Sequence, residues 1–165
     1  MIRLLAAARS LVYMTGFVLL WGWIALQVDR MAGGALPALP PSARPAGAAL
    51  MVIGGLLASW CVAAFVVAGR GTPAPFDPPR ALVPVGPYRW VRNPMYLGGF
   101  LVMIGFGAWR ASPAIVLLAV PFAVLAHLFV VLYEERTLGR RFGAAYTAYR
   151  ALVNRWLPQR PGATR

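Results

Sequence analysis

The residues from Gly86 to Gly98 read GPYRWVRNPMYLG and separate two long apolar runs. Pro87 and Pro94 cannot donate backbone hydrogen bonds, and each pushes the residue before it out of helical geometry. The stretch therefore predicts a shaped connector and not the interior of a helix. Its aromatic residues Tyr88, Trp90 and Tyr96 stand close to Arg89 and Arg92. This combination makes the connector the place where we expect chemistry.

The chain as a whole is unusually apolar. Of its 165 residues, 60% are hydrophobic and 12% are charged, which is typical of an integral membrane protein and not of a soluble domain. The formal charge is +12, and all 16 basic residues are arginines. Such a charge can indicate a nucleic-acid binder, but the long apolar runs argue against one. We expect the lipid bilayer, and no nucleic acid, as a partner.

Four apolar segments predict transmembrane helices in one all-α membrane domain. They cover residues 11–28, 46–68, 96–109 and 114–133. The third segment is short, and Arg110–Pro113 joins it to the fourth as a helical hairpin. A loop rich in proline and glycine, Asp29–Pro45, joins the first two. Two pairs of small residues in the second segment, spaced for close helix packing, are Gly54 with Ala58 and Gly55 with Ser59.

The distribution of arginines predicts the orientation of the chain. The N-terminal segment, the second loop Gly69–Asn93 and the tail after Tyr133 together carry 13 arginines, whereas the opposite side carries three. We therefore expect both termini in the cytoplasm, with the second loop and the tail at the same face. An arginine-rich tail favours an anionic leaflet, so a plasma or inner membrane is the expected location.

The tail from Glu134 to Leu157 predicts an amphipathic helix. Its apolar stripe consists of Leu138, Phe142, Ala145, Tyr146, Tyr149, Leu152, Val153 and Trp156. We expect this helix to lie along the membrane surface, where its arginines meet lipid phosphate. Gly143 predicts a break in the helix, and Pro158 predicts its end.

Two glutamates, Glu134 and Glu135, follow the last apolar segment directly. A carboxylate at the membrane end of a span is costly without a partner. One interpretation is that both glutamates pair with Arg136 or Arg140. The other is that Glu134 faces inward and holds a polar or cationic ligand against the arginine-rich connector.

His127 lies seven residues before Glu134 and so almost on the same helical face. A packed, hydrogen-bonded neutral histidine is one interpretation of it, and a catalytic role is the other. The single cysteine, Cys61, is interpreted as a small apolar residue. The sequence has no metal-ligand spacing, so we expect no metal site.

Two motifs of this sequence, separated along the chain, together match the pattern of a known protein family. They are Gly86-Pro-Tyr88-Arg-Trp-Val-Arg92-Asn93-Pro94-Met-Tyr96-Leu-Gly98 and Glu134-Glu135-x-x-Leu138-x-x-x-Phe142-Gly143-x-x-Tyr146-x-x-Tyr149, followed by Arg155-Trp-Leu-Pro158. In this order they resemble the isoprenylcysteine carboxyl methyltransferase family, and the related phospholipid N-methyltransferases share a looser version. The resemblance covers roughly Arg80–Pro158, which is about half of the chain.

The resemblance implies a membrane-embedded methyltransferase that depends on S-adenosylmethionine. It implies a cofactor site between the connector and the start of the tail, formed by Ala81, Leu82, Val83, Tyr88, Asn93, Pro94, Met95, Tyr96 and Glu134. The resemblance does not assign catalytic residues, and Arg92, Asn93 and Glu134 are candidates for positioning residues. The residue chemistry agrees, since carboxylates and aromatic faces stabilise a sulfonium cation and arginines bind a carboxylate.

Two positions depart from the family's pattern. Asn93 stands where eukaryotic members have histidine, and Val130 stands where they have an arginine for the substrate's carboxylate. We therefore expect a small or lipid-like acceptor, and its reacting group, a carboxylate, thiol or amine, stays open, as does the oligomeric state. The alternatives are a phospholipid amine N-methyltransferase, and a non-catalytic membrane scaffold or transporter subunit.

Overall fold

The structure is a computed structural model that describes residues 2–69 and 81–159. Every regular element in these residues is a helix, as predicted. The α-helices are α1 (Ile2–Ala32), α2 (Ala43–Ala64), α3 (Pro94–Trp109), α4 (Pro113–Phe129) and α5 (Glu135–Leu152). The shorter turns are the π-helical η1 (Phe65–Gly69) and η3 (Val130–Glu134) and the 3-10 turn η2 (Gly86–Arg89). Outside the described residues lie Arg70, Asp77, Arg80, Arg160 and Arg165.

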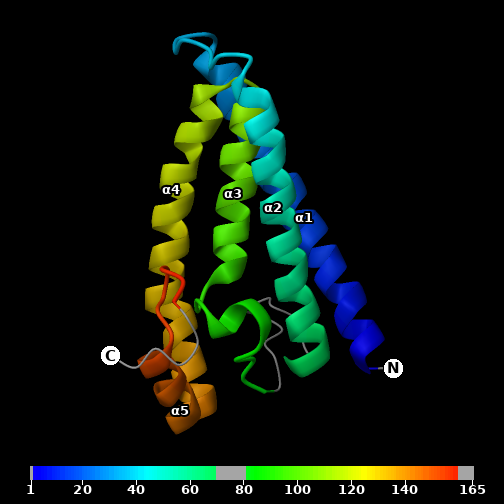
Figure 1. The fold of residues 1–165 in the computed structure, drawn as a ribbon, viewed down its shortest axis with the longest axis vertical. Coiled ribbons are helices and arrows are strands. Elements are labelled where there is room, and N and C mark those ends of the chain that lie inside the picture. The colour runs from blue at the N-terminus through cyan, green and yellow to red at the C-terminus, as the bar shows by residue number, and fades with distance from the viewer. Residues whose placement is uncertain (1, 70–80, 160–165) are drawn as a thin grey trace.

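The four predicted spans are apolar helices that form one bundle (Figure 1). Leu4–Ala32, Ala43–Ala68 and Pro113–Leu152 are long and apolar enough to cross a bilayer, while Pro94–Trp109 is a shorter apolar helix. The prediction of an all-α membrane fold is therefore confirmed.

Several helix ends differ from the predicted ones. Asp29–Ala32 continue α1 and Ala43–Pro45 open α2, so the first loop spans residues 33–42 only. Pro45 and Pro94 each occupy a first helical turn, where the missing N–H has no intrahelical partner to lose. Helix α3 thus begins at Pro94, two residues before the predicted start of the third span at Tyr96, and the connector itself contains the short 3-10 turn η2.

The two ends of the bundle are held by different loops (Figure 1). At one end, the amide of Leu39 donates to the carbonyl of Ala111 at 3.0 Å, and Arg110 pairs with Asp29 at 3.2 Å. The connector and α5 lie at the other end. The predicted meeting of second loop and tail is confirmed for residues 81–93, while the side of the membrane stays a prediction.

Helices α2 and α3 touch through glycines. A Cβ atom added to Gly54 would lie 2.5 Å from the carbonyl oxygen of Gly98, and one added to Gly105 would lie 2.6 Å from that of Gly47. The two backbones therefore pack directly, as the Gly54 and Ala58 pair predicts. The prediction for Gly55 was wrong, since nothing lies within 4 Å of its added Cβ. The core continues around Phe122 of α4, whose ring lies 4.8 Å from that of Trp21 and 5.1 Å from that of Phe100.

Helix α4 passes through η3 into α5 without leaving helical hydrogen bonding. The predicted break occurs at Gly143, whose φ of 51° and ψ of −126° are not helical. The predicted end at Pro158 was wrong, because α5 ends at Leu152 and Val153 is extended. The predicted apolar stripe is only partly an inward face, since Tyr146 is buried while Leu152 is exposed. Both residues follow the break at Gly143, so the stripe is divided between a buried and an exposed position within the last part of α5.

Candidate functional site

The connector approaches α3 through a tight turn. Gly86 has a φ of +58°, which favours glycine, and an added Cβ would lie 3.1 Å from Nε1 of Trp60. Pro87 follows in η2, and Asn93 then precedes α3 with a non-helical φ and ψ. Because α3 begins at Pro94, Tyr96 stands on its first turn. The side chain of Tyr96 is thereby fixed by helix and connector together.

A segment that follows α5, residues 153–159, runs along the connector and is called the strap below. The amide of Arg92 donates to the carbonyl of Asn154 at 2.8 Å, and the amide of Gln159 donates to the carbonyl of Trp90 at 2.9 Å. The side-chain amide of Asn93 donates to the carbonyl of Arg155 at 3.1 Å. The strap and the connector are therefore joined at three points, and the role of Asn93 in the structure is to hold the strap.

The two sequence motifs meet at Tyr96 and Glu134. The Tyr96 hydroxyl donates to Oε2 of Glu134 at 3.0 Å. The Trp156 ring, from the strap, stands at 73° to the Tyr96 ring with the centroids 6.2 Å apart. This gives a carboxylate, a phenol and an indole at one place. Since Glu134 ends the π-helical turn η3, its direction depends on that wider turn.

Glu135 has different partners from Glu134. Its carboxylate lies 2.7 Å from Nε of Arg155, 3.0 Å from Nη1 of Arg92 and 3.7 Å from Nη2 of Arg150. The interpretation that Glu135 pairs with Arg136 or Arg140 was wrong, because arginines from the connector and strap reach it instead. The hydrogen bond to Glu135 raises the pKa of Arg155 above its ordinary value, so the guanidinium stays charged.

Arg92 has an unsatisfied donor. Its side chain is 10% exposed, and one end of its guanidinium is paired with Glu135. Its buried Nε has no hydrogen-bond partner among the described residues. A buried donor without a partner is uncommon and costs free energy. Arg92 therefore retains a capacity for an anionic ligand.

The other predicted site residues divide into two groups. Val83 and Tyr88 are buried in an apolar cluster with Cys61 and Ala64, and Met95 packs against it. Burial raises the pKa of Tyr88 well above its ordinary value, so its phenol stays neutral. Its backbone carbonyl accepts a hydrogen bond from the Tyr149 hydroxyl at 2.7 Å. Cys61 is a buried apolar residue, as interpreted.

The two residues before Val83 are less buried than this cluster. Ala81 is exposed, and Leu82 is half-buried. Pro94 is fully buried beside Asn93 at the start of α3. The structure thus brings Asn93, Pro94, Tyr96 and Glu134 to one end of the bundle, where Val83, Tyr88 and Met95 pack against α2.

Sequence reasoning missed the contributions of Trp156 and Arg155. Both lie within the quoted closing stretch Arg155-Trp-Leu-Pro158, but that pattern gave them no role. His127 is hydrogen-bonded, as one interpretation held, since its Nδ1 accepts from Trp156 at 3.1 Å. It is not packed inside the bundle, because its side chain is exposed.

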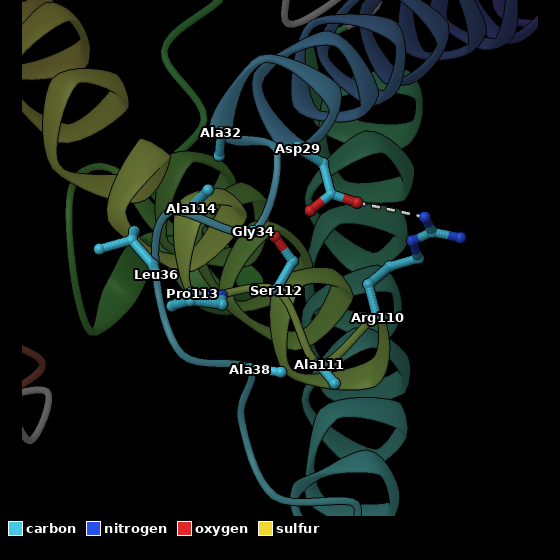
Figure 2. Close-up of a pocket in the computed structure, with 10 residues that line it drawn as sticks. All are labelled: Asp29, Ala32, Gly34, Leu36, Ala38, Arg110, Ala111, Ser112, Pro113 and Ala114. Carbon is cyan, nitrogen blue, oxygen red and sulfur yellow. Dashed lines mark hydrogen bonds and ion pairs between the residues drawn. The ribbon is translucent and has the colours of Figure 1, made fainter.

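A pocket of about 130 Å³ lies at the far end of the bundle (Figure 2). It is lined by Asp29, Ala32, Gly34, Leu36, Ala38, Arg110, Ala111, Ser112, Pro113 and Ala114. These residues come from the first loop and the turn between α3 and α4, together with the ends of the neighbouring helices. The pocket is separated from Tyr96 and Glu134 by the length of the bundle, so it is not part of the site built by the two motifs.

A comparison with protein families matches residues 43–145 to a family described as phospholipid methyltransferase. The matched part is more than half of the chain, and it contains the connector, Tyr96 and both glutamates. This family is related to the one that the two motifs resemble. No curated protein and no solved structure matches the chain.

Proposed function

We propose a function from one premise: this chain belongs to the phospholipid methyltransferase family. Membership makes it an integral membrane methyltransferase. We infer further that the methyl donor is S-adenosylmethionine and that the acceptor is a small or lipid-like molecule. The observation that carries this inference is the hydrogen bond between Tyr96 and Glu134, which joins the two motifs at one end of the bundle.

The residues around Tyr96 fit a sulfonium cation. A carboxylate stabilises a positive charge, and aromatic faces attract one when they lie near it. Glu134 supplies the carboxylate, the Tyr96 hydroxyl donates to it, and the Trp156 ring contacts the ring of Tyr96. Because Arg92, Arg150 and Arg155 all converge on Glu135, they do not neutralise Glu134. Glu134 is thus the carboxylate that suits a cationic ligand.

The donor's own carboxylate also has a suitable partner. The Nε of Arg92 is a buried donor without a hydrogen bond to another described residue. A guanidinium binds a carboxylate through charge-assisted hydrogen bonds. Glu135 holds the far end of Arg92, which keeps its guanidinium in one orientation. Ala81, Leu82 and Val83 remain candidates for backbone contacts with the same ligand, with Tyr88, Asn93, Pro94 and Met95 around it.

S-adenosylmethionine, when bound, supplies a methyl group on a sulfonium whose thioether is the leaving group. The protein's task is then to orient donor and acceptor in line and to exclude water. Glu134 and Tyr96 would fix the donor's charged centre, and Arg92 and Asn93 would keep the surrounding connector in place. A carboxylate acceptor needs no general base, whereas an amine must lose its proton.

The acceptor has two candidate classes: the carboxylate of a prenylcysteine and the amine of a phospholipid headgroup. Position 130, where the isoprenylcysteine enzymes have an arginine, is Val130, whose side chain is 1% exposed and points into the protein. A prenylcysteine carboxylate would therefore need another partner. This favours the second class, an amine of a phospholipid headgroup, which the description of the matched family also favours.

Location and orientation belong to the same proposal. The exposed arginines Arg136, Arg140 and Arg141 lie on α5, at the end of the bundle that holds the site. Basic residues of this kind concentrate at the cytoplasmic leaflet. We infer that the site opens to the cytoplasmic side of a plasma or inner membrane.

Calorimetric titration tests the proposed donor. Purified protein in detergent and in lipid nanodiscs is titrated with S-adenosylmethionine and with its demethylated product. We expect saturable binding that weakens at least tenfold in Glu134→Gln, because that change removes the carboxylate charge and keeps its shape. Thr137→Ser, a mild change one helical turn away, serves as the control. Well-folded wild type that binds neither compound would refute the proposal and favour the non-catalytic scaffold.

A further inference from the structure

A polar side chain lies on the outside of an apolar helix. Helix α4 reads PAIVLLAVPFAVLAHLF, in which His127 is the single polar residue. Its side chain is exposed, although α4 belongs to a segment apolar enough to cross a bilayer. An imidazole that faces hydrocarbon is costly unless its nitrogens have partners. The position of His127 therefore needs an explanation beyond packing.

Trp156 satisfies one of the two imidazole nitrogens. Its indole Nε1–H donates to Nδ1 of His127 at 3.1 Å, and the two ring centroids are 6.1 Å apart. An indole nitrogen is a donor only, so Nδ1 must be an unprotonated acceptor. The neutral ring then carries its proton on Nε2. His127 is thus fixed as an Nε2–H donor on the surface of α4.

The same tryptophan links His127 to the proposed donor site. The ring of Trp156 contacts that of Tyr96, and Tyr96 donates to Glu134. His127 precedes Glu134 by seven residues, which is about 10 Å along a helix. Along α4, His127 lies closer to the middle of the bilayer than Glu134 does. A lipid-like molecule that reaches the site from the bilayer would meet His127 first.

We propose that His127 donates a hydrogen bond from Nε2 to an oxyanion of the methyl acceptor and so positions the acceptor beside Tyr96 and Glu134. This role rests on the proposed function, because it requires an acceptor. The group that His127 would recognise is an oxyanion close to the reacting atom. In a phospholipid this oxyanion is the phosphodiester beside the amine, and in a prenylcysteine it is the carboxylate. His127 would then supply the polar contact that Val130 cannot.

Nitrogen NMR tests the contact directly. The chain has one histidine, so labelling histidine with 15N reports His127 alone. The full chain is studied in dodecyl maltoside, which carries no oxyanion, and is saturated with S-adenosylhomocysteine. We expect the Nε2–H tautomer in wild type, and a loss of that preference in Trp156→Phe, which keeps an aromatic ring but has no N–H.

Two probes then distinguish the sources of the oxyanion. One is phosphatidylethanolamine, and the other is N-acetyl-S-farnesylcysteine, with its methyl ester as the matched control without an oxyanion. We expect the Nε2 resonance to shift with at least one of the two probes and not with the ester. A shift with the lipid alone assigns a phosphate, and a shift with the farnesyl compound alone assigns a carboxylate. If neither probe shifts the Nε2 resonance, the proposal is wrong.

Kinetics separate positioning from a structural role. With the probe that shifts Nε2, His127→Leu should raise the acceptor KM about tenfold and leave kcat and donor affinity within about twofold. His127→Gln should recover most of the loss, since its amide both accepts and donates. An unchanged KM in His127→Leu would contradict the assignment. Wild type that fails to bind the donor would refute the proposed function instead, so the two failures are distinguishable.

Discussion

Arg92 and Glu135 form an ion pair of 3.0 Å in which both side chains are largely buried. Arg92 belongs to the connector, and Glu135 begins α5. The strap adds Arg155 to the same carboxylate at 2.7 Å. One glutamate at the start of α5 therefore binds arginines of both the connector and the strap, while its neighbour Glu134 accepts a hydrogen bond from Tyr96.

Replacing Glu135 by glutamine should destabilise the protein strongly. The change leaves Arg92 with an uncompensated charge at a buried position, and breaking such a pair costs about 3–5 kcal/mol. Thermal unfolding in detergent measures the effect. Asp29→Asn is the control, because its pair with Arg110 is exposed and should contribute less than about 1 kcal/mol. Equal losses in the two variants would contradict the assigned role of Glu135.

Removing the Tyr96 hydroxyl should weaken donor binding and leave the fold intact. Tyr96→Phe keeps the ring beside Trp156 but loses the hydrogen bond to Glu134, which corresponds to about a tenfold or greater loss of affinity. Titration calorimetry measures the change. Tyr133→Phe alters an exposed tyrosine next to Glu134 and should bind as wild type does. If both variants bind alike, the hydroxyl does not orient Glu134.

Adjacent glycines in α2 should respond in opposite ways. An added methyl group at Gly54 would lie 2.5 Å from the Gly98 carbonyl, so Gly54→Ala must separate α2 from α3 and should cost about 1–3 kcal/mol. Gly55→Ala meets nothing within 4 Å and should be neutral or slightly stabilising. Unfolding of both variants in detergent gives the comparison. A destabilised Gly55→Ala with an unaffected Gly54→Ala would refute the packing of these helices.

The break in α5 should depend on glycine at position 143. Gly143 has a φ of 51° and a ψ of −126°, a conformation that costs a residue with a side chain about 1–3 kcal/mol. Gly143→Ala should therefore lower the melting temperature and displace the strap. Gly139→Ala, whose added Cβ makes only an ordinary contact with Tyr146, should not. Donor affinity measured beside the melting temperature would show whether the strap moves with the break.

The sequence predicted the helices well because apolar length alone marks a span. It could not decide which of Gly54 and Gly55 meets α3, since both have the same spacing and only the rotation of the helix separates them. The bend at Gly143 was predictable because glycine tolerates backbone conformations that other residues avoid.

The site was harder to predict than the spans. Tyr96 and Glu134 came together in the sequence only through resemblance, because no local pattern relates residues so far apart. The partners of Glu135 were predicted wrongly for the same reason: Arg136 and Arg140 lie within five residues of it in the sequence, whereas Arg92 and Arg155 reach it through the tertiary fold.

The strap has a consequence for biosynthesis. Residues 153–159 emerge from the ribosome after all four apolar helices, yet they hold Asn93, Arg92 and Trp90 of the connector. The helices can enter the membrane before the connector has its final partners. Assembly of the site is therefore a late event, because it cannot be complete before residues 153–159 have been made.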